Sequence, residues 1–356
     1  MKAAIKLGII ALLVALLPMV AGASVIVSRH VPAEARHLQP LDRLPASNRL
    51  NLAIGLPVQN RAVLTQLLRD LYDPANPRFH QYLTAAQFAA QFGPTEQHYQ
   101  AVVKFAQSNG LTVTGTHANR LLVDVSGSVE EIEKAFHTHL RVYQHPTEGR
   151  TFYAPDSDPW LDLSVPVLGI NGLDDFILPH PMNIQTADAT AYTSGSGPSG
   201  FFIGNDFRAA YAPGVTLTGA GQAVGLFELD GYDVQDIMEY ESLAKLPNMA
   251  LTNILLDGFS GTAGANNLEV ALDIDMAICM APGLSRVIVY EGLTPNDVLN
   301  RMATDNQARQ LSSSWGFGPQ TDPVRAQIFE EFAAQGQTMF QASGDSGAYS
   351  GQVSSP

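Results

Sequence analysis

Residues 267–290 of this 356-residue chain are NLEVALDIDMAICMAPGLSRVIVY. Residues 267–280 have the apolar content of a buried helix, and residues 285–290 form a short, nearly continuous apolar run typical of a buried strand. A helix followed at once by an apolar strand is the unit from which parallel sheets covered by helices are built. The stretch therefore predicts an α/β fold.

The same alternation extends on both sides of this stretch. Strand-like runs occupy residues 222–229, 253–259, 285–290, 309–315 and 338–342, and helix-like runs occupy 234–245, 267–280, 295–306 and 323–335. This order predicts a doubly wound parallel sheet, whose ligand sites lie at the carboxyl ends of the strands.

The first half has a different order of elements. Strands are expected at 50–58, 111–117, 120–126 and 140–144, and helices at 61–72, 84–92 and 95–108. Ser128 followed by Glu131 is a capping box that opens a further helix through Phe136. The order β-α-β-β-α-β predicts a ferredoxin-like α+β sandwich.

The N-terminus and the middle of the chain differ in composition from both halves. Residues 1–23 carry two lysines, an apolar run from Leu7 to Val20 and the small residues Ala21-Gly22-Ala23, as in a cleaved signal peptide. A membrane anchor is the alternative, but the run is short for a span. Residues 193–200, TSGSGPSG, have linker composition. We expect a signal peptide at 1–23, domains at 35–155 and 201–356 with a linker at 156–200, and export to the extracellular space or periplasm.

Composition limits the classes of function. With 46% hydrophobic and 15% charged residues the chain is globular, and its one cysteine, Cys279, excludes an intramolecular disulfide. From Pro181 onward there are 19 acidic and 6 basic residues, which argues against a nucleic-acid partner. All nine histidines lie at or before His180, so chemistry in the second half has no imidazole of its own.

Glu269 and Asp273 stand four residues apart in the helix-like run 267–280, which contains no Lys or Arg. That spacing places both carboxylates on one helix face. Two like charges in apolar surroundings raise at least one pKa, which suits a carboxylate for proton transfer. The alternatives are that both acids are solvated at an exposed helix end, or that they bind a cation.

Residues 344–347, Gly-Asp-Ser-Gly, imitate the nucleophile motif of trypsin-like proteases. Those enzymes are all-β and need a histidine base, whereas this half alternates helix and strand and has no histidine. The sequence alone therefore supports only a glycine-rich turn after a strand.

Four stretches, in order along the chain, resemble landmarks of the sedolisin (kumamolisin, serine-carboxyl) peptidase family. Residues 72–94, YDPANPRFHQYLTAAQFAAQFGP, resemble the signature of its activation propeptide. Residues 269–273 with 281–283, residues 313–316 and residues 343–347 resemble three landmarks of its peptidase domain. The similarity runs from about residue 35 to the C-terminus.

The resemblance implies a subtilisin-like fold behind an activation propeptide, a maturation site in the linker, and proteolysis at acid pH. Carried over residue by residue, Glu269 is the base that deprotonates a serine, Asp273 orients and tunes Glu269, and Asp345 is the oxyanion acid. Polypeptides are the implied substrates, cleaved by an endopeptidase or a tripeptidyl-peptidase. The propeptide is an intramolecular partner, and neither nucleic acid nor, after signal cleavage, a membrane is expected.

The chain departs from the family at the nucleophile. The family's serine lies in a Gly-Thr-Ser turn downstream of the Gly-Asp-Ser-Gly segment, and no Gly-Thr-Ser occurs here. The calcium loop implied by the resemblance lies further on and is also expected to be absent from this chain. Either the chain is part of a longer precursor, or it is a secreted, non-catalytic binding protein of the same fold. In both cases we expect the 356 residues alone to be inactive.

The division of charge also suggests how the two halves respond to pH. An acidic second half should attract the more balanced, histidine-bearing first half near neutral pH. We expect protonation of the second half's carboxylates, below about pH 4.5, to release the first half, with the histidines as bystanders or a brake.

Overall fold

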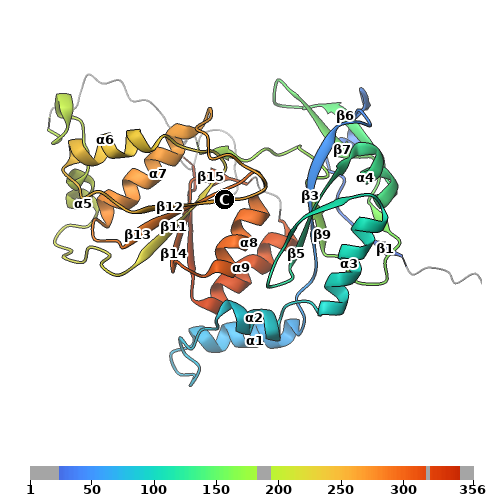
Figure 1. Ribbon diagram of the computed structural model, residues 1–356, viewed down its shortest axis with the longest axis horizontal. Helices are drawn as coiled ribbons and strands as arrows, with labels where there is room; N and C mark the ends of the chain where they lie inside the picture. Colours follow the sequence, from blue (N-terminus) through green and yellow to red (C-terminus); the bar gives the residue numbers. More distant parts are fainter. Residues whose placement is uncertain (1–23, 183–193, 318–320, 345–356) are drawn as a thin grey trace, which may run out of the picture.

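The computed structural model describes residues 24–182, 194–317 and 321–344. Figure 1 shows the first half, blue to green, beside the second half, yellow to red, with helices α8 and α9 between the two sheets. The expected signal peptide at 1–23 lies outside the described residues. Within those residues, no helix combines the length and the apolar character needed to cross a bilayer.

The main sheet of the first half is antiparallel, with the order β4-β5-β3-β9. Its strands are β3 (Arg49–Gly55), β4 (Thr112–Thr116), β5 (Leu122–Ser128) and β9 (Gly169–Asn171). The expected strand β6 (Leu140–Gln144) is present, but it pairs with β2 (Asp42–Arg43) and β7 (Thr151–Pro155) in another sheet. The prediction that this strand completes the main sheet is wrong, because β9 pairs with β3 there and buries Ile170 in the core.

Three of the four α-helices described in the first half begin at a capping side chain, Thr84, Thr95 or Ser128. The four helices are α1 (Arg61–Tyr72), α2 (Ala85–Gln91), α3 (Glu96–Ser108) and α4 (Val129–Phe136), close to the expected ranges. The Ser128–Glu131 capping box is confirmed, and Thr84 with Gln87 forms a second one. A short 3-10 helix, Ala35–His37, precedes them.

The segment expected to be a linker, 156–200, contains regular structure. Strand β8 (Trp160–Leu161) pairs with β1 (Val25–Ile26), β9 joins the main sheet, and β10 (His180–Pro181) pairs with a strand of the second half. A 3-10 turn, Pro198–Gly200, closes the segment. Strands of two or three residues are too short to show a period in the sequence, and for this reason the segment resembled a linker.

The second half is built on a five-stranded parallel sheet with the order β12-β13-β11-β14-β16. Its strands are β11 (Ala223–Glu228), β12 (Leu251–Leu255), β13 (Arg286–Glu291), β14 (Gln310–Ser313) and β16 (Thr338–Gln341). The predicted parallel sheet is confirmed. Strands β11, β14 and β16 lie within the expected ranges, and β13 ends just beyond its range, at Glu291. Strand β12 was expected at 253–259 and lies earlier, at Leu251–Leu255. The two-residue β15 (Trp315–Gly316) follows β14 and belongs to the pair with β10.

Helices cover both faces of this sheet, α6 and α7 on one side and α8 and α9 on the other (Figure 1). They are α5 (Asn205–Tyr211), α6 (Val234–Ala244), α7 (Asn267–Met280), α8 (Pro295–Asp305) and α9 (Pro323–Gln335). Helix α7 is less buried than its composition suggests, because Leu268 and Leu272 are 61% and 39% exposed.

The two halves share one continuous apolar core. Phe88 and Leu64, from α2 and α1, belong to the same buried cluster as Ile328 and Phe332 of α9. The boundary is also hydrogen-bonded: Gln327 accepts from the backbone N–H of Val58 and donates to the carbonyl of Leu56. The first half is thus docked through a buried interface.

Candidate active site

The carboxyl ends of β11, β13, β14 and β16 form one edge of the parallel sheet, and α7 starts close to this edge. Asp230, just after β11, fixes the loop that leads into α7, since its carboxylate accepts from the backbone N–H groups of Gly264 (2.9 Å) and Asn266 (2.7 Å). Glu269 therefore lies in the first turn of α7, close to this edge of the sheet, and is buried, with an exposed fraction of 6%. Asp273 follows one turn later.

Asp273 makes a hydrogen bond with the strand edge. The Ser314 hydroxyl, directly after β14, donates to Asp273 Oδ1 at 2.7 Å. The helix pair that spacing alone predicted is thereby connected to the Ser313–Gly316 landmark. Those two motifs are 41 positions apart, so only the fold brings them together.

A third carboxyl, Glu228 at the end of β11, was not identified from the sequence. It is fully buried, and the Trp315 indole N–H donates to its Oε2 at 2.8 Å. Its carboxyl also shares a side-chain hydrogen bond with Asp273. An acid that ends a buried apolar strand, at the edge where ligand sites lie, is the sequence signal that could have identified it.

The pKa directions show where the proton between these two carboxyls resides. Burial, and then the charge of Asp273, raises the pKa of Glu228 well above its ordinary value, and the charge of Glu269 adds to this. Burial raises the pKa of Asp273 as well, but hydrogen bonds from Ser314 and Glu228 oppose that rise. Glu228 therefore holds the proton and donates it to an ionised Asp273.

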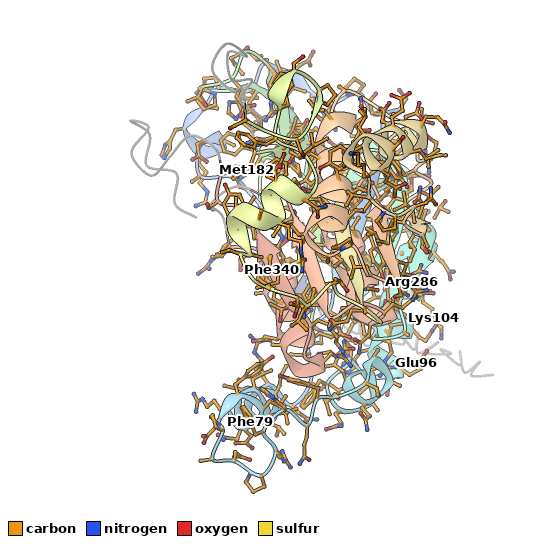
Figure 2. All side chains as sticks on the ribbon, turned by 90° about the vertical axis from the view of Figure 1, so that its left-hand side faces the viewer. Phe79, Glu96, Lys104, Met182, Arg286 and Phe340 are labelled. Atoms are coloured by element: carbon orange, nitrogen blue, oxygen red, sulfur yellow. The ribbon has the colours of Figure 1, made fainter. Side chains whose placement is uncertain are left out.

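A segment of the first half lies against this edge as an added strand. His180–Pro181 pairs antiparallel with Trp315–Gly316, and the backbone N–H of Met182 donates to the Ser314 carbonyl at 3.1 Å. A Cβ atom on Gly316 would lie 2.7 Å from Met182 Sδ and 3.6 Å from the His180 carbonyl oxygen, so a larger residue there would require the Met182 side chain to move. Figure 2 shows Met182 above Phe340 of β16 on this side of the molecule.

Asp345, the expected oxyanion acid, lies outside the described residues, as does Ser346. The strand that leads toward it is described: β16 pairs with β14, and the Ala342 backbone N–H donates to the Ser313 carbonyl at 3.0 Å. Gly344, the last described residue, has a φ of +95° that favours glycine.

A pocket of about 250 Å³ lies between α7 and strands β11, β14 and β16, and of the three carboxyls only Asp273 lines it. Asp273 and Ser312 contribute polar atoms to its wall, and Met276, Met280 and Phe340 contribute apolar ones. Glu228, Glu269 and Asp273 do not form a group with metal-ligand spacing among the described residues. The arrangement suits proton transfer next to a bound peptide strand.

Comparisons with known proteins show which sequences this chain resembles. Residues 36–176 match the family described as the pro-kumamolisin activation domain. Sedolisin of Pseudomonas sp. (strain 101) is 28% identical over 339 residues, which are 89% of this chain and 57% of that protein. Kumamolisin of Bacillus sp. (strain MN-32) is 27% identical over 305 residues, 78% of this chain and 53% of that protein. The chain thus contains a region that matches the pro-kumamolisin activation domain, and it is similar in sequence to sedolisin and kumamolisin.

The chain spans about half the length of these sedolisin-family relatives, 57% and 53%. The activation-domain match extends to residue 176, beyond β9, and the expected domain end at 155 lies within it. The solved structure of Pseudomonas sedolisin complexed with two molecules of pseudo-iodotyrostatin covers 41% of this chain and 45% of its own, at 23% identity and a TM-score of 0.37. A score that low carries no argument about the fold.

Proposed function

We propose that the chain is the precursor of a secreted, acid-active serine-carboxyl peptidase. The observation that carries the proposal is the group formed by the buried carboxyls Glu269 and Glu228 and the half-buried Asp273, beside a peptide strand paired with Trp315–Gly316. With no imidazole in this half of the sequence, a buried carboxylate is the available proton acceptor.

Glu269 is the proposed general base, which takes the proton of a serine nucleophile. Asp273 is a positioning residue, held by the Ser314 hydroxyl and by the proton on Glu228. Because burial and the charge of Asp273 raise the pKa of Glu228 well above its ordinary value, its carboxyl favours the neutral form and the group carries less negative charge than three ionised acids would. This lowers the cost of keeping Glu269 ionised at the acid pH we propose for the enzyme.

Asp345 is the proposed oxyanion acid. Its strand, β16, ends next to Ser313, one residue from the Ser314 hydroxyl that binds Asp273. A carboxyl that is protonated in acid can donate a hydrogen bond to the oxyanion, and the loss of one such donor costs about 10²–10³ in rate.

The substrate is proposed to be a polypeptide that lies antiparallel to Trp315–Gly316, where His180–Met182 lie in this structure. Strand addition of this kind supplies affinity through main-chain hydrogen bonds. The first half then acts as an intramolecular propeptide that blocks the site, and cleavage within 156–200 would release it. Endopeptidase and tripeptidyl-peptidase action both remain compatible with this geometry.

The remaining parts of the proposal rest on the family resemblance. They are a subtilisin-like fold for 201–356, a propeptide at 35–155, export through residues 1–23, a serine nucleophile in a Gly-Thr-Ser turn, and calcium bound further along a longer chain. The 356 residues contain no Gly-Thr-Ser, so we expect no peptide hydrolysis from them alone.

The direct test is the nucleotide sequence downstream of the Pro356 codon. An in-frame Gly-Thr-Ser followed by proline, and turnover of a peptide at pH 4 by the extended protein, would support the proposal. A stop codon directly after Pro356 would overturn it in favour of a non-catalytic binding protein. Turnover by the 356 residues alone that is abolished by Ser346→Ala would instead revive a local nucleophile.

A further inference from the structure

A second cluster of chemically active side chains lies at the boundary between the two halves. His117 and Asp124 belong to the first half, just before β5 and within it, and Asp297 lies in the first turn of α8. His117 Nε2 is 2.7 Å from Asp124 Oδ2. One possible ligand atom from each of the three residues lies within 4.8 Å of the other two.

Both carboxylates in this cluster are buried and incompletely satisfied. Asp124 is 7% exposed and Asp297 3% exposed, and no N–H or O–H among the described residues donates to the Oδ1 atom of either. The side-chain hydrogen bonds of Asp297 are shared with two other carboxyls, Asp124 and Asp257. Among the described residues, His117 is the one basic side chain that forms an ion pair with Asp124 or Asp297. Burial, and then the charges of Asp124 and Asp257, raises the pKa of Asp297 well above its ordinary value. Burying these carboxylates therefore carries an electrostatic cost that either a shared proton or a bound cation offsets.

The fold makes room for these oxygens. Gly115 stands opposite Asp124 at an irregularity between β4 and β5, where a Cβ atom would lie 2.1 Å from Asp124 Oδ2. On the other side, Asp257 Oδ2 accepts from the backbone N–H groups of Leu293 and Thr294 and so fixes the start of α8 next to Asp297. The three side chains are thus held in place from both halves.

We propose that His117, Asp124 and Asp297 bind one divalent transition-metal cation, of which Zn²⁺ is the expected example, and that this cation joins the first half to the second. One imidazole and two carboxylates are a ligand set that suits zinc, whereas calcium and magnesium prefer oxygen ligands alone. Because the ligands come from both halves, the cation binds the docked form and stabilises it. The proposal goes beyond peptidase activity and does not depend on it.

Zinc binding is tested on the metal-stripped full chain by calorimetric titration with ZnCl₂. We expect one Zn²⁺ per chain, and a loss of affinity of at least about tenfold in both Asp297→Asn and His117→Gln. His137→Gln is the matched control, because His137 pairs with Asp162 at 3.1 Å on the exposed surface of the first half. It should bind zinc like the wild type. Zn²⁺ should also raise the Tm of the wild type but not that of Asp297→Asn.

Several outcomes would overturn the proposal. If the wild type binds no zinc and Asp297→Asn raises the Tm without metal, the acids are compensated by a shared proton. If zinc binding is lost in His117→Gln but retained in Asp297→Asn, the cation does not join the two halves. Circular dichroism identifies a variant that fails to fold. If Asp297→Asn does not fold, the zinc affinity of His117→Gln tests the site, and the reverse holds if His117→Gln does not fold.

Discussion

Two groups of buried carboxyls in the second half differ in where their partners come from. Around Asp273, the partners Ser314, Glu228 and Trp315 all belong to the second half. Glu331 of α9, by contrast, accepts from Asn119 of the first half at 2.7 Å. Both groups have raised pKa values caused mainly by burial. Protonation of the first group therefore alters the chemistry of the site, whereas protonation of Glu331 alters the docking of the two halves.

The largest expected effect is at Glu269. In a precursor extended through the Gly-Thr-Ser segment, Glu269→Gln should lower kcat at pH 4 by at least about a hundredfold, because an amide cannot accept the serine proton. Asp275→Asn is the matched control, since Asp275 lies on the same helix but faces Glu241 and Asp236 of α6. Its kcat should match the wild type. A near-normal kcat in Glu269→Gln would remove this residue from the mechanism.

The next largest effect concerns the docked strand His180–Met182, and it is tested without changing the carboxyls beside it. Gly316→Val adds a branched side chain whose Cβ atom would lie 2.7 Å from Met182 Sδ and 3.6 Å from the His180 carbonyl oxygen. The Met182 side chain can move away, but the two γ-methyl groups crowd the His180 backbone. Amide hydrogen exchange at Met182, whose N–H donates to the Ser314 carbonyl, should therefore increase by at least about threefold. Gly149→Val is the control, because a Cβ atom there meets no other atom within 4 Å. Unchanged exchange at Met182 would show that the strand does not depend on Gly316.

The sequence predicted most of the elements but only part of the site. Helices were found because their caps and apolar spacing are local, as at Ser128 and Glu131. Glu228 was missed because its importance comes from Trp315, 87 positions away. The docked strand at His180 was missed because two residues show no periodicity. Long-range pairing and short strands are therefore what local patterns could not reveal.

The third effect concerns Glu331 and the pH dependence of docking. Burial raises the pKa of Glu331 to about 8, so the docked form favours the neutral acid. Its contribution to stability is present at acid pH and is lost as the pH rises toward 8. Glu331→Gln should therefore reduce the fall in Tm between pH 5 and pH 8 by several degrees. Glu239→Gln, at an exposed position on α6, is the control and should leave that fall nearly unchanged.

This direction opposes the expectation that acid releases the first half by protonating carboxylates of the second. An acid whose pKa is raised on docking binds its proton more tightly in the docked form, so protonation favours docking. If the Tm of the wild type falls rather than rises from pH 8 to pH 5 and Glu331→Gln abolishes that fall, the original expectation regains its support.

The smallest expected effect concerns His30, which gives the first half an acid-sensitive contact. The Ile170 backbone N–H, in β9, donates to His30 Nε2 at 3.2 Å, and a protonated ring cannot accept it. Burial lowers the pKa of His30, although the charges of Asp158 and Asp322 act in the opposite direction. The stability that the neutral ring provides is complete above about pH 6.5 and decreases as the pH falls below it.

Strand β9 connects this histidine to the docking interface, because Asn171, next to Ile170, donates to Asp322 of the second half at 2.8 Å. Loss of the His30 contact therefore loosens a strand that both halves share, and the histidine is then more than a bystander. His30→Gln keeps a neutral acceptor at every pH, so it should reduce the loss of Tm between pH 7 and pH 5 by a few degrees. His98→Gln on α3 is the control and should show the wild-type loss. If the wild type and both variants lose the same Tm between pH 7 and pH 5, His30 does not cause the acid response, and the carboxyls remain as its source.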